Sequence, residues 1–295
     1  MLGSSSAAGA APCEGWCQVS VQIAVASVTL GSGFPGLVYS QIKKNLRAGE
    51  SLVECATIMS DVEFARPRML ALLETVPRPV ALIGICIRPD PVTLAAYRAA
   101  GVPVVLVDEE AEGVSTVASD NFAGGYLAGK HLAAAGRKRI AVVSGETGVT
   151  GGYNAAQRVK GMAKALGEHG LSLAPEDRVE VVQYSRREGA AAMSRFLDAK
   201  RWPDAIFCAA GDTCATGLLA AARERRVKVP EEVAVVGYDD SPLAGISDPP
   251  LTTVRQPLDR IAREAHRLAT EEAATILAKP KAVLFEPTLV VRASA

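Results

Sequence analysis

The sequence has no excess of charge of either sign. Thirty-two basic residues are matched by thirty-two acidic ones, so the formal net charge of the 295-residue chain is zero. Proteins that bind nucleic acid usually carry a basic surface, and the composition excludes a basic field over the whole chain. The local basic cluster Arg137–Arg139 follows an expected helix, where positive charge complements the helix dipole.

Long apolar runs are also absent. No run reaches the roughly 18 to 20 residues that span a bilayer, and residues 1–20 contain neither Lys nor Arg. We therefore expect no membrane span and no secretory signal, and the sequence predicts a cytoplasmic protein. The only competing signal is Cys13, which ends a poor version of a lipoprotein site.

Residues suited to metal binding and catalysis are few. The three histidines, His131, His169 and His266, fall in expected helices and form no metal-binding pair. The six cysteines lack zinc-ligand spacing, so reduced thiols are expected. No Gly-x-Ser-x-Gly, His-Glu-x-x-His or Walker A motif occurs. The sequence therefore predicts no catalytic residue, no metal and no cofactor.

Apolar runs alternate with segments of helical period after residue 18, and residues 1–18 read as a disordered tail. The expected strands are Gln22–Val28, Leu52–Met59, Val80–Ile87, Val104–Val107, Arg139–Val143, Val179–Gln183, Ala205–Cys208 and Val233–Gly237. The expected helices are Leu37–Ala48, Phe64–Glu74, Pro91–Ala100, Asn121–Ala135, Asn154–His169, Arg187–Ala199, Thr213–Arg226 and Leu258–Ala278. Strands without polar alternation, each followed by a helix, indicate parallel sheets covered on both faces.

Two architectures accommodate these strand–helix pairs: one closed barrel, or two open sheets in tandem. The chain end favours the second architecture. Thr252–Pro257 and Val283–Val291 are extended, bounded by proline and separated by a single helix, as suits strands that cross between two lobes.

The segment Gly31–Gly36 is a literal Gly-x-Gly-x-x-Gly between a strand and a helix. That spacing suits a dinucleotide pyrophosphate, and Asp61 near the next strand end would then bind the ribose. A lone motif of this kind is more often a flexible strand-to-helix turn. A nucleotide-cofactor oxidoreductase stays as an alternative that rests on this segment alone.

Polar residues gather where α/β sheets bind ligands. Asn154 and Arg158 share one helix face, Tyr184 follows an expected strand, and Asp239 follows another. An arginine, a carboxylate, an amide and an aromatic ring around one crevice are suited to a polyol, because charged groups bind hydroxyls and rings cover C–H faces. Taken alone, each of these residues is more often a helix cap or a surface charge, so the prediction rests on the set.

Several motifs in order resemble the sensor domain of lactose/galactose-repressor (LacI/GalR) regulators. The resemblance covers residue 20 to the end of the chain. Its motifs are Ser119–Gly125 leading to His131-Leu132, Gly136–Ala141, Arg158–Gly161, Val229–Asp240 and Pro249–Pro257.

This resemblance implies two Rossmann-like lobes with parallel sheets, joined by three crossovers in the manner of type I periplasmic binding proteins. It implies a homodimer and a small effector in the cleft, in most cases a sugar and in some a nucleobase or nucleoside. The implied ligand-binding residues are Phe34, Asn121, Asn154, Arg158, Tyr184, Gly211 and Asp239, and the implied hinge residues are Gln256 and Pro257.

The expected N-terminal lobe is 19–136 plus 257–283, and the expected C-terminal lobe is 137–256 plus 284–295. The crossovers are expected near Gly136, Arg255–Pro257 and Val283–Phe285.

Two features depart from the family pattern. Gly211-Asp212 stands where the family usually has Asn-Asp, so an amide that would contact ligand is missing. The first residues also hold no basic helix and are too short for a helix-turn-helix head, so the chain as written is expected to sense a ligand without reading DNA.

The sequence therefore predicts the sugar-sensing core of a LacI/GalR-type regulator that acts by ligand-biased lobe closure and is not an enzyme. DNA is a partner only if a head is present in the full gene product, and no membrane partner is expected. The alternative function is a solute-binding protein of a sugar uptake transporter.

Overall fold

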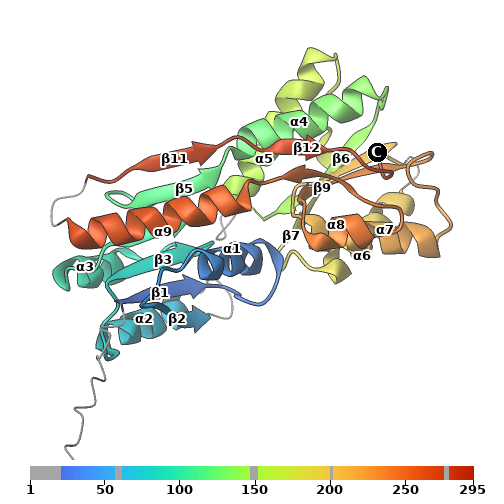
Figure 1. The fold of residues 1–295 in the computed structure, drawn as a ribbon. Coiled ribbons are helices and arrows are strands. Elements are labelled where there is room, and N and C mark those ends of the chain that lie inside the picture. The colour runs from blue at the N-terminus through green and yellow to red at the C-terminus, as the bar shows by residue number, and fades with distance from the viewer. Residues whose placement is uncertain (1–20, 57–61, 147–151, 200–201, 276–278) are drawn as a thin grey trace, which may run out of the picture.

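The computed structural model describes residues 21–56, 62–146, 152–199, 202–275 and 279–295. The expected tail 1–18, Asp61, and the outer ends of the expected elements at 57–59 and 276–278 lie outside these ranges. The described residues form two α/β lobes side by side, each built on a six-stranded sheet (Figure 1). The prediction of two parallel-sheet lobes joined by three crossovers is confirmed.

The first lobe has helices on both faces of its sheet. The strands, in spatial order, are β11 (Ala282–Phe285), β5 (Ser115–Ser119), β4 (Val104–Val107), β3 (Ala81–Ile85), β1 (Val21–Ser27) and β2 (Glu50–Ala56), and all neighbours are parallel. The helices are α1 (Gly33–Lys44), α2 (Val62–Ala71) with the 3-10 turn Leu72–Glu74, α3 (Pro91–Ala99) and α9 (Leu258–Ala274).

The second lobe repeats this plan. Its strands, in spatial order, are β12 (Thr288–Val290), β10 (Thr252–Arg255), β9 (Ala234–Asp239), β8 (Ala205–Cys208), β6 (Ile140–Gly145) and β7 (Arg178–Val181), with only the β10–β12 pair antiparallel. Its helices are α4 (Asn121–Ala134), α5 (Gly152–Glu168), α6 (Arg186–Leu197), α7 (Asp212–Glu224) and α8 (Pro242–Ile246), with the 3-10 turn Pro175–Asp177 before β7.

Burial on both faces explains why the strands read as continuous apolar runs. In β1, Ile23 and Val25 join the core cluster under α1 and α9, whereas Ala24 and Ala26 join the cluster on the opposite face. All four side chains are fully buried. Alternate residues of a strand point to opposite faces, so a strand covered by helices on both sides has no polar face.

The chain crosses between the lobes at three places, and two of them differ from expectation. The first crossover lies at Asp120, where β5 ends, and not near Gly136, because Ala128 and Leu132 of α4 pack in the core of the second sheet. Asp120 also begins this helix, since its Oδ1 accepts a hydrogen bond from the Ala123 amide at 2.8 Å. The boundary expected at residue 136 is therefore replaced by one near residue 120.

The second crossover lies at Gln256–Pro257, as expected, and leads from β10 of the second lobe to α9 on the first. The third crossover lies between Phe285 and Thr288, just after the expected position, because all of β11 belongs to the first sheet. Figure 1 shows β11 and β12 as one extended segment running along both lobes.

Strand β5 and the short helix α8 were not among the expected elements, and α1 begins earlier than expected. Strand β5 has the sequence Ser-Thr-Val-Ala-Ser, and its polar residues interrupt the apolar run that would predict a strand. Helix α8 is a single helical turn. Helix α1 begins at Gly33 instead of Leu37, which places Phe34 in its first turn.

Helices α4 and α5 approach closely because glycines face the partner helix. A Cβ at Gly161 would overlap the backbone oxygen of Phe122, and a Cβ at Gly125 would overlap the backbone oxygen of Arg158. Only glycine permits this distance between backbones. The close approach places the backbone of Arg158 directly against α4.

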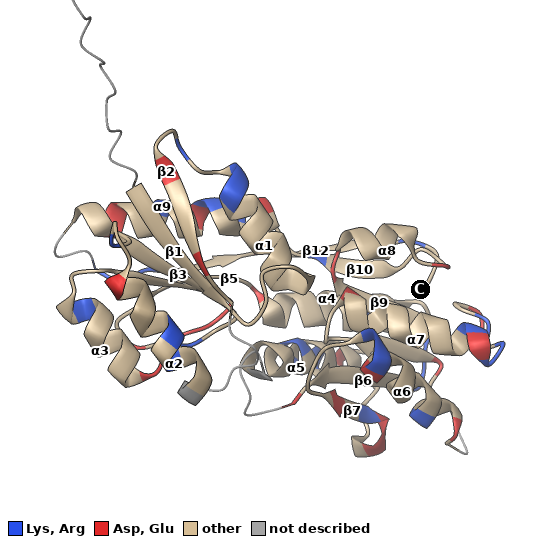
Figure 2. Cartoon of the chain, turned by 90° about the horizontal axis from the view of Figure 1, so that it is seen from below, with Lys and Arg blue, Asp and Glu red and all other residues tan. Residues whose placement is uncertain are grey.

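Neither lobe displays charge of one sign. Figure 2 shows basic and acidic residues interspersed over both lobes, in agreement with the zero net charge. Among the described residues, no helix combines the length and apolar character required to cross a membrane.

Candidate functional site

A cavity of about 580 Å³ lies between the two lobes. The first lobe lines it with Val28, Thr29, Ser32, Gly33, Phe34, Pro35, Cys86 and Asp108, and the second lobe lines it with Arg158, Val182, Gln183, Tyr184, Ser185, Arg186, Ala210, Gly211, Thr213 and Asp239. A ligand in this space would therefore touch both lobes at once. Carboxyl ends of parallel strands and the loops that follow them supply most of these residues, as is usual in open α/β sheets.

Four cavity residues that are not glycine have a positive φ at or just after strand ends. They are Cys86 (φ 51°), Asp108 (φ 59°), Tyr184 (φ 53°) and Asp239 (φ 106°). L residues rarely adopt such values, and backbone strain of this kind is concentrated at binding and active sites. The positive φ values are therefore concentrated in the cavity lining.

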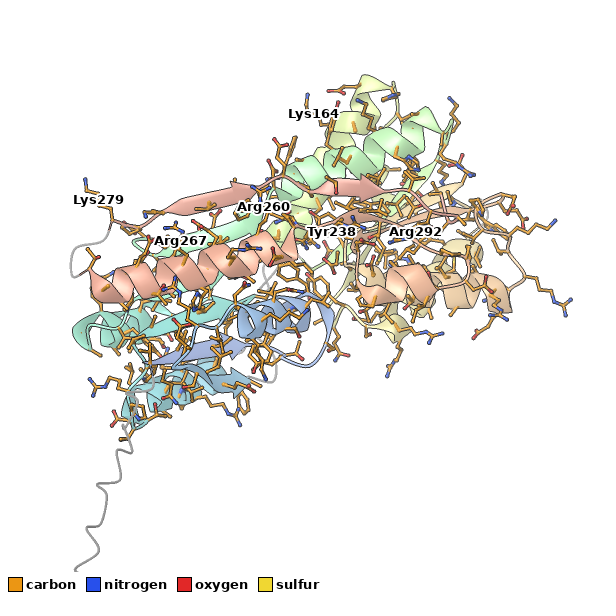
Figure 3. The ribbon with its side chains drawn as sticks, in the orientation of Figure 1. Lys164, Tyr238, Arg260, Arg267, Lys279 and Arg292 are labelled. Carbon is orange, nitrogen blue, oxygen red and sulfur yellow. The ribbon has the colours of Figure 1, made fainter. Side chains whose placement is uncertain are left out.

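Arg158 is 6% exposed and is held from several sides. Its Nε donates to Asn121 Oδ1 at 2.7 Å, and its Nη1 donates to the carbonyl oxygen of Ala209 at 2.8 Å. Its guanidinium carbon lies 3.8 Å from the ring centroid of Tyr238, which Figure 3 labels where the lobes meet. The remaining nitrogen, Nη2, lies 3.9 Å from Asp108 Oδ2 of the first lobe. This geometry leaves Nη2 available to a ligand.

Asn121 and Asn154 do not line the cavity. Asn121 donates from Nδ2 to Asp108 Oδ1 at 3.2 Å and accepts from Arg158, and it is 5% exposed. Asn154 donates from Nδ2 to the carbonyl oxygen of Asp108. Asn121 therefore positions both Asp108 and Arg158, and Asn154 positions Asp108.

Asp239 is 9% exposed and joins the cavity to the second crossover. Its Oδ1 accepts from Gln256 Nε2 at 2.7 Å, and Gln256 is itself 2% exposed. Asp212 lies behind it, accepting from Thr253 Oγ1 at 2.6 Å and from the Ser241 amide at 2.7 Å. Asp212 therefore does not cap α7; it is the first residue of that helix, and its carboxylate bonds to other elements.

Burial changes the acidity of these groups. Desolvation, reinforced by the charge of Asp239, raises the pKa of Asp212 to about 7. Desolvation also raises the pKa of Asp239 to about 6, although the charge of Arg158 opposes the shift. Burial likewise raises the pKa of Asp108 against the effect of Arg158. The second lobe thus places two buried acids close together, with Asp239 at the cavity wall and Asp212 behind it.

Tyr184 packs against backbone, with its hydroxyl at the position that a Cβ on Gly145 would occupy. The hydroxyl is buried and has no hydrogen-bond partner among the described residues. Burial raises its pKa to about 12, so it remains protonated.

The sequence singled out five residues that line this one cavity: Phe34, Arg158, Tyr184, Gly211 and Asp239. It missed others, including Asp108 and Cys86 of the first lobe. Their place in the chain could have identified them, because Cys86 and Asp108 each directly follow a strand, and Asp239 is the last residue of one. Within the described residues no group of three His, Cys, Asp or Glu side chains is placed to hold a metal ion.

A second cavity of about 690 Å³ lies near α7 and α8 in the second lobe. The ionisable residues that line it, Arg186, Arg223, Glu224 and Asp248, are all exposed. The cavity between the lobes is the better candidate, because its charged groups are desolvated and converge from separate elements.

These features define a two-lobed ligand-binding protein of the α/β class. Residues 130–295 match the family model of the periplasmic binding protein-like domain. The chain belongs to this family, in the branch represented by the LacI-family transcriptional regulators. The family resemblance expected from the sequence motifs is confirmed.

Among curated relatives, the chain is 38% identical over 176 residues to the HTH-type transcriptional repressor PurR of Mannheimia succiniciproducens, which covers 59% of this chain and 51% of the relative. The chain spans about half the length of the curated relatives it matches. The relatives named here are transcriptional regulators and not enzymes.

Solved structures extend the similarity over nearly the whole chain. The transcriptional regulator CelR in complex with cellobiose has a TM-score of 0.81 and 27% identity, covering 93% of this chain and 84% of that one. A LacI-family regulator from Sanguibacter keddieii has a TM-score of 0.79 and 29% identity, covering 93% and 99%.

Proposed function

We propose that this chain is the effector-sensing core of a LacI/GalR-type transcriptional regulator and that its effector is a sugar or sugar derivative. The observation that carries the proposal is the cavity between the lobes, where Arg158 and Asp239 of the second lobe face Asp108 of the first. Each of the three side chains is more than nine-tenths buried.

The chemistry of the cavity supports a polyhydroxylated ligand. Arg158 Nη2 donates and the carboxylates of Asp108 and Asp239 accept, so vicinal hydroxyls find both kinds of partner. Phe34 and Val182 supply apolar surface for the C–H faces of a sugar ring. The similarity to CelR, solved with cellobiose, is consistent with this ligand class.

Ligand binding would change the arrangement of the lobes. A ligand held by both lobes stabilises whichever arrangement gives it more contacts, so it shifts an existing equilibrium. The three crossovers are the segments that would absorb this movement, with Gln256 and Pro257 as hinge residues on the second. Pro257 restricts φ and so limits the directions in which that crossover bends.

The regulator role carries further proposals about partners and location. The core would work as a homodimer in the cytoplasm, since twofold symmetry places two DNA-binding heads on a palindromic operator. Operator binding would require such a head in the full gene product. The uptake-transporter alternative predicts a monomer, so light scattering at micromolar concentration distinguishes the two functions.

Isothermal titration calorimetry tests the ligand class directly. The panel contains neutral mono- and disaccharides including cellobiose, amino sugars, and nucleobases with their nucleosides. Binding of a saccharide or amino sugar that is lost in Arg158→Ala supports the proposal. Binding of nucleobases or nucleosides alone, or sugar binding that Arg158→Ala leaves unchanged, contradicts it.

A further inference from the structure

One oxygen of Asp239 faces the cavity without a partner. Oδ1 accepts from Gln256, but Oδ2 makes no hydrogen bond within the part of the chain that the structure describes. A Cβ built on Gly211 would lie 2.7 Å from this Oδ2, so the oxygen points into the space above Gly211. The side chain is nine-tenths buried, and water therefore screens it poorly.

Gly211 creates that space. Its φ of +95° lies in the region that favours glycine, and any side chain here would meet the carboxylate. The LacI/GalR pattern usually has an asparagine at this position, whose amide is a donor. This chain has Gly211 instead, so the amide donor is missing and a space remains beside the carboxylate of Asp239.

The charges around the cavity leave a negative surplus. Arg158 is the one buried cation among the lining residues, and it faces two buried carboxylates, Asp108 and Asp239. Arg186 also lines the cavity but is exposed, so solvent screens its charge. Asp212 adds another acid directly behind Asp239.

We propose that the effector carries a protonated amine that lies above Gly211 and donates a hydrogen bond to Asp239 Oδ2. The ligand class is an amino sugar or a closely similar polyhydroxylated amine, so this inference rests on the proposed sugar-sensing function. A hydroxyl also donates to a carboxylate, but only a cation balances the surplus charge that lobe closure would bury.

The same groups determine the pH dependence of this contact. The ionisable groups around Asp239 are Arg158 on α5, Asp212 on α7, Tyr238 on β9, and Asp108 and Cys86 after β4 and β3. Acidification protonates the coupled acids and removes their attraction for a cation. The affinity for an amine therefore falls as the pH drops through about 6, whereas the affinity for the matching neutral sugar changes less.

Calorimetry on matched triplets tests the inference: D-glucosamine, D-glucose and N-acetyl-D-glucosamine, with the equivalent galactose and mannose series. In each triplet the scaffold is constant and only the C2 substituent changes between ammonium, hydroxyl and acetamide, of which the ammonium alone is charged. In at least one series the amine should bind about tenfold or more tightly than both neutral members. Asp239→Asn should remove most of that difference, whereas Asp198→Asn, the same change at an exposed acid of the same lobe, should preserve it.

Each outcome bears on a different claim. If neutral sugars bind as tightly as their amines, or if the amine keeps its advantage in Asp239→Asn, this inference is wrong while the sugar-sensing function stands. If no member of any triplet and no saccharide of the wider panel binds, the sugar-sensing function fails and this inference fails with it. Circular dichroism and a thermal melt establish that Asp239→Asn is folded before its affinity is compared.

Discussion

Gln256 donates a hydrogen bond to Asp239 at 2.7 Å and so connects the second crossover to the wall of the cavity. The crossover continues into α9, whose residues Ile261 and Leu268 are fully buried against the first sheet. Gln256 Oε1 is buried without a partner among the described residues. A buried unsatisfied oxygen is costly, and the bond to Asp239 is the one side-chain hydrogen bond of Gln256 among the described residues.

We predict that Gln256→Leu weakens the coupling between binding and lobe movement more than it weakens binding. Leucine is similar in size to glutamine but cannot donate a hydrogen bond to Asp239. The crossover is then no longer linked to the cavity wall by that bond. Small-angle scattering with a ligand identified by calorimetry should show less compaction than in the wild type. Arg255→Lys, which keeps a cation beside Asp240, should compact normally. Full compaction in Gln256→Leu would show that the bond is not needed.

Arg158→Ala should reduce ligand affinity by about 2 kcal/mol or more, because it removes a desolvated charge-assisted donor. It should also lower the free energy of unfolding by about 3 kcal/mol, since Asp108 and Asn121 would be left buried without their partner. Calorimetry and urea denaturation measure the two effects. Arg186→Ala, at the exposed rim of the same cavity, should change both quantities much less.

Stability should depend on pH through the coupled acids Asp212 and Asp239. Their pKa values are raised in the folded state, to about 7 and about 6, so between pH 4 and 7 these two acids bind more protons in the folded chain than in the unfolded chain. Their contribution to stability is therefore fully present near pH 4 and is lost as the pH rises through 7.

Asp212→Asn checks this dependence, because an amide does not titrate. Relative to the variant, the wild type should lose roughly 2 kcal/mol of unfolding free energy between pH 5 and pH 7.5. Urea denaturation at the two pH values gives the difference. An equal change in both proteins would mean that other groups govern the pH dependence.

Two glycines of α5 should respond in opposite directions to the same substitution. Gly161→Ala places a methyl group into the Phe122 backbone oxygen and should destabilise the fold by about 2 to 3 kcal/mol. Gly167→Ala meets nothing within 4 Å and should be neutral or stabilising by about 0.5 to 1 kcal/mol. Thermal denaturation of the two variants distinguishes the effect of close helix packing on stability from the effect of helix propensity.

The sequence predicted the fold well because buried parallel strands are apolar on both faces. Ala205–Cys208 was located to the residue, and both its faces pack in core clusters. Strand β5 was not predicted, because Ser115, Thr116 and Ser119 interrupt its apolar pattern. Its pairing with β4 and β11 makes it a strand. Pairing with distant strands determines the structure of this segment, and the local sequence pattern holds no information on that pairing.

Only part of the site was predicted from the sequence, because the rest depends on backbone conformation. Arg158 and Asp239 belong to motifs that the sequence displays, and the structure brings both to the cavity. Asp108 and Cys86 reach it through positive φ at strand ends, a feature with no signature in residue type. The first crossover was misplaced because α4 follows β5 directly, and only packing reveals that this helix belongs to the second lobe.

Hydrogen exchange with and without a bound sugar or amino sugar is the most direct test of a ligand site between the lobes. Peptides covering 28–35 of the first lobe and 182–186 of the second should both exchange more slowly in the complex, because both line the cavity. Protection confined to one lobe, or to the second cavity around residues 243–248, would contradict binding between the lobes.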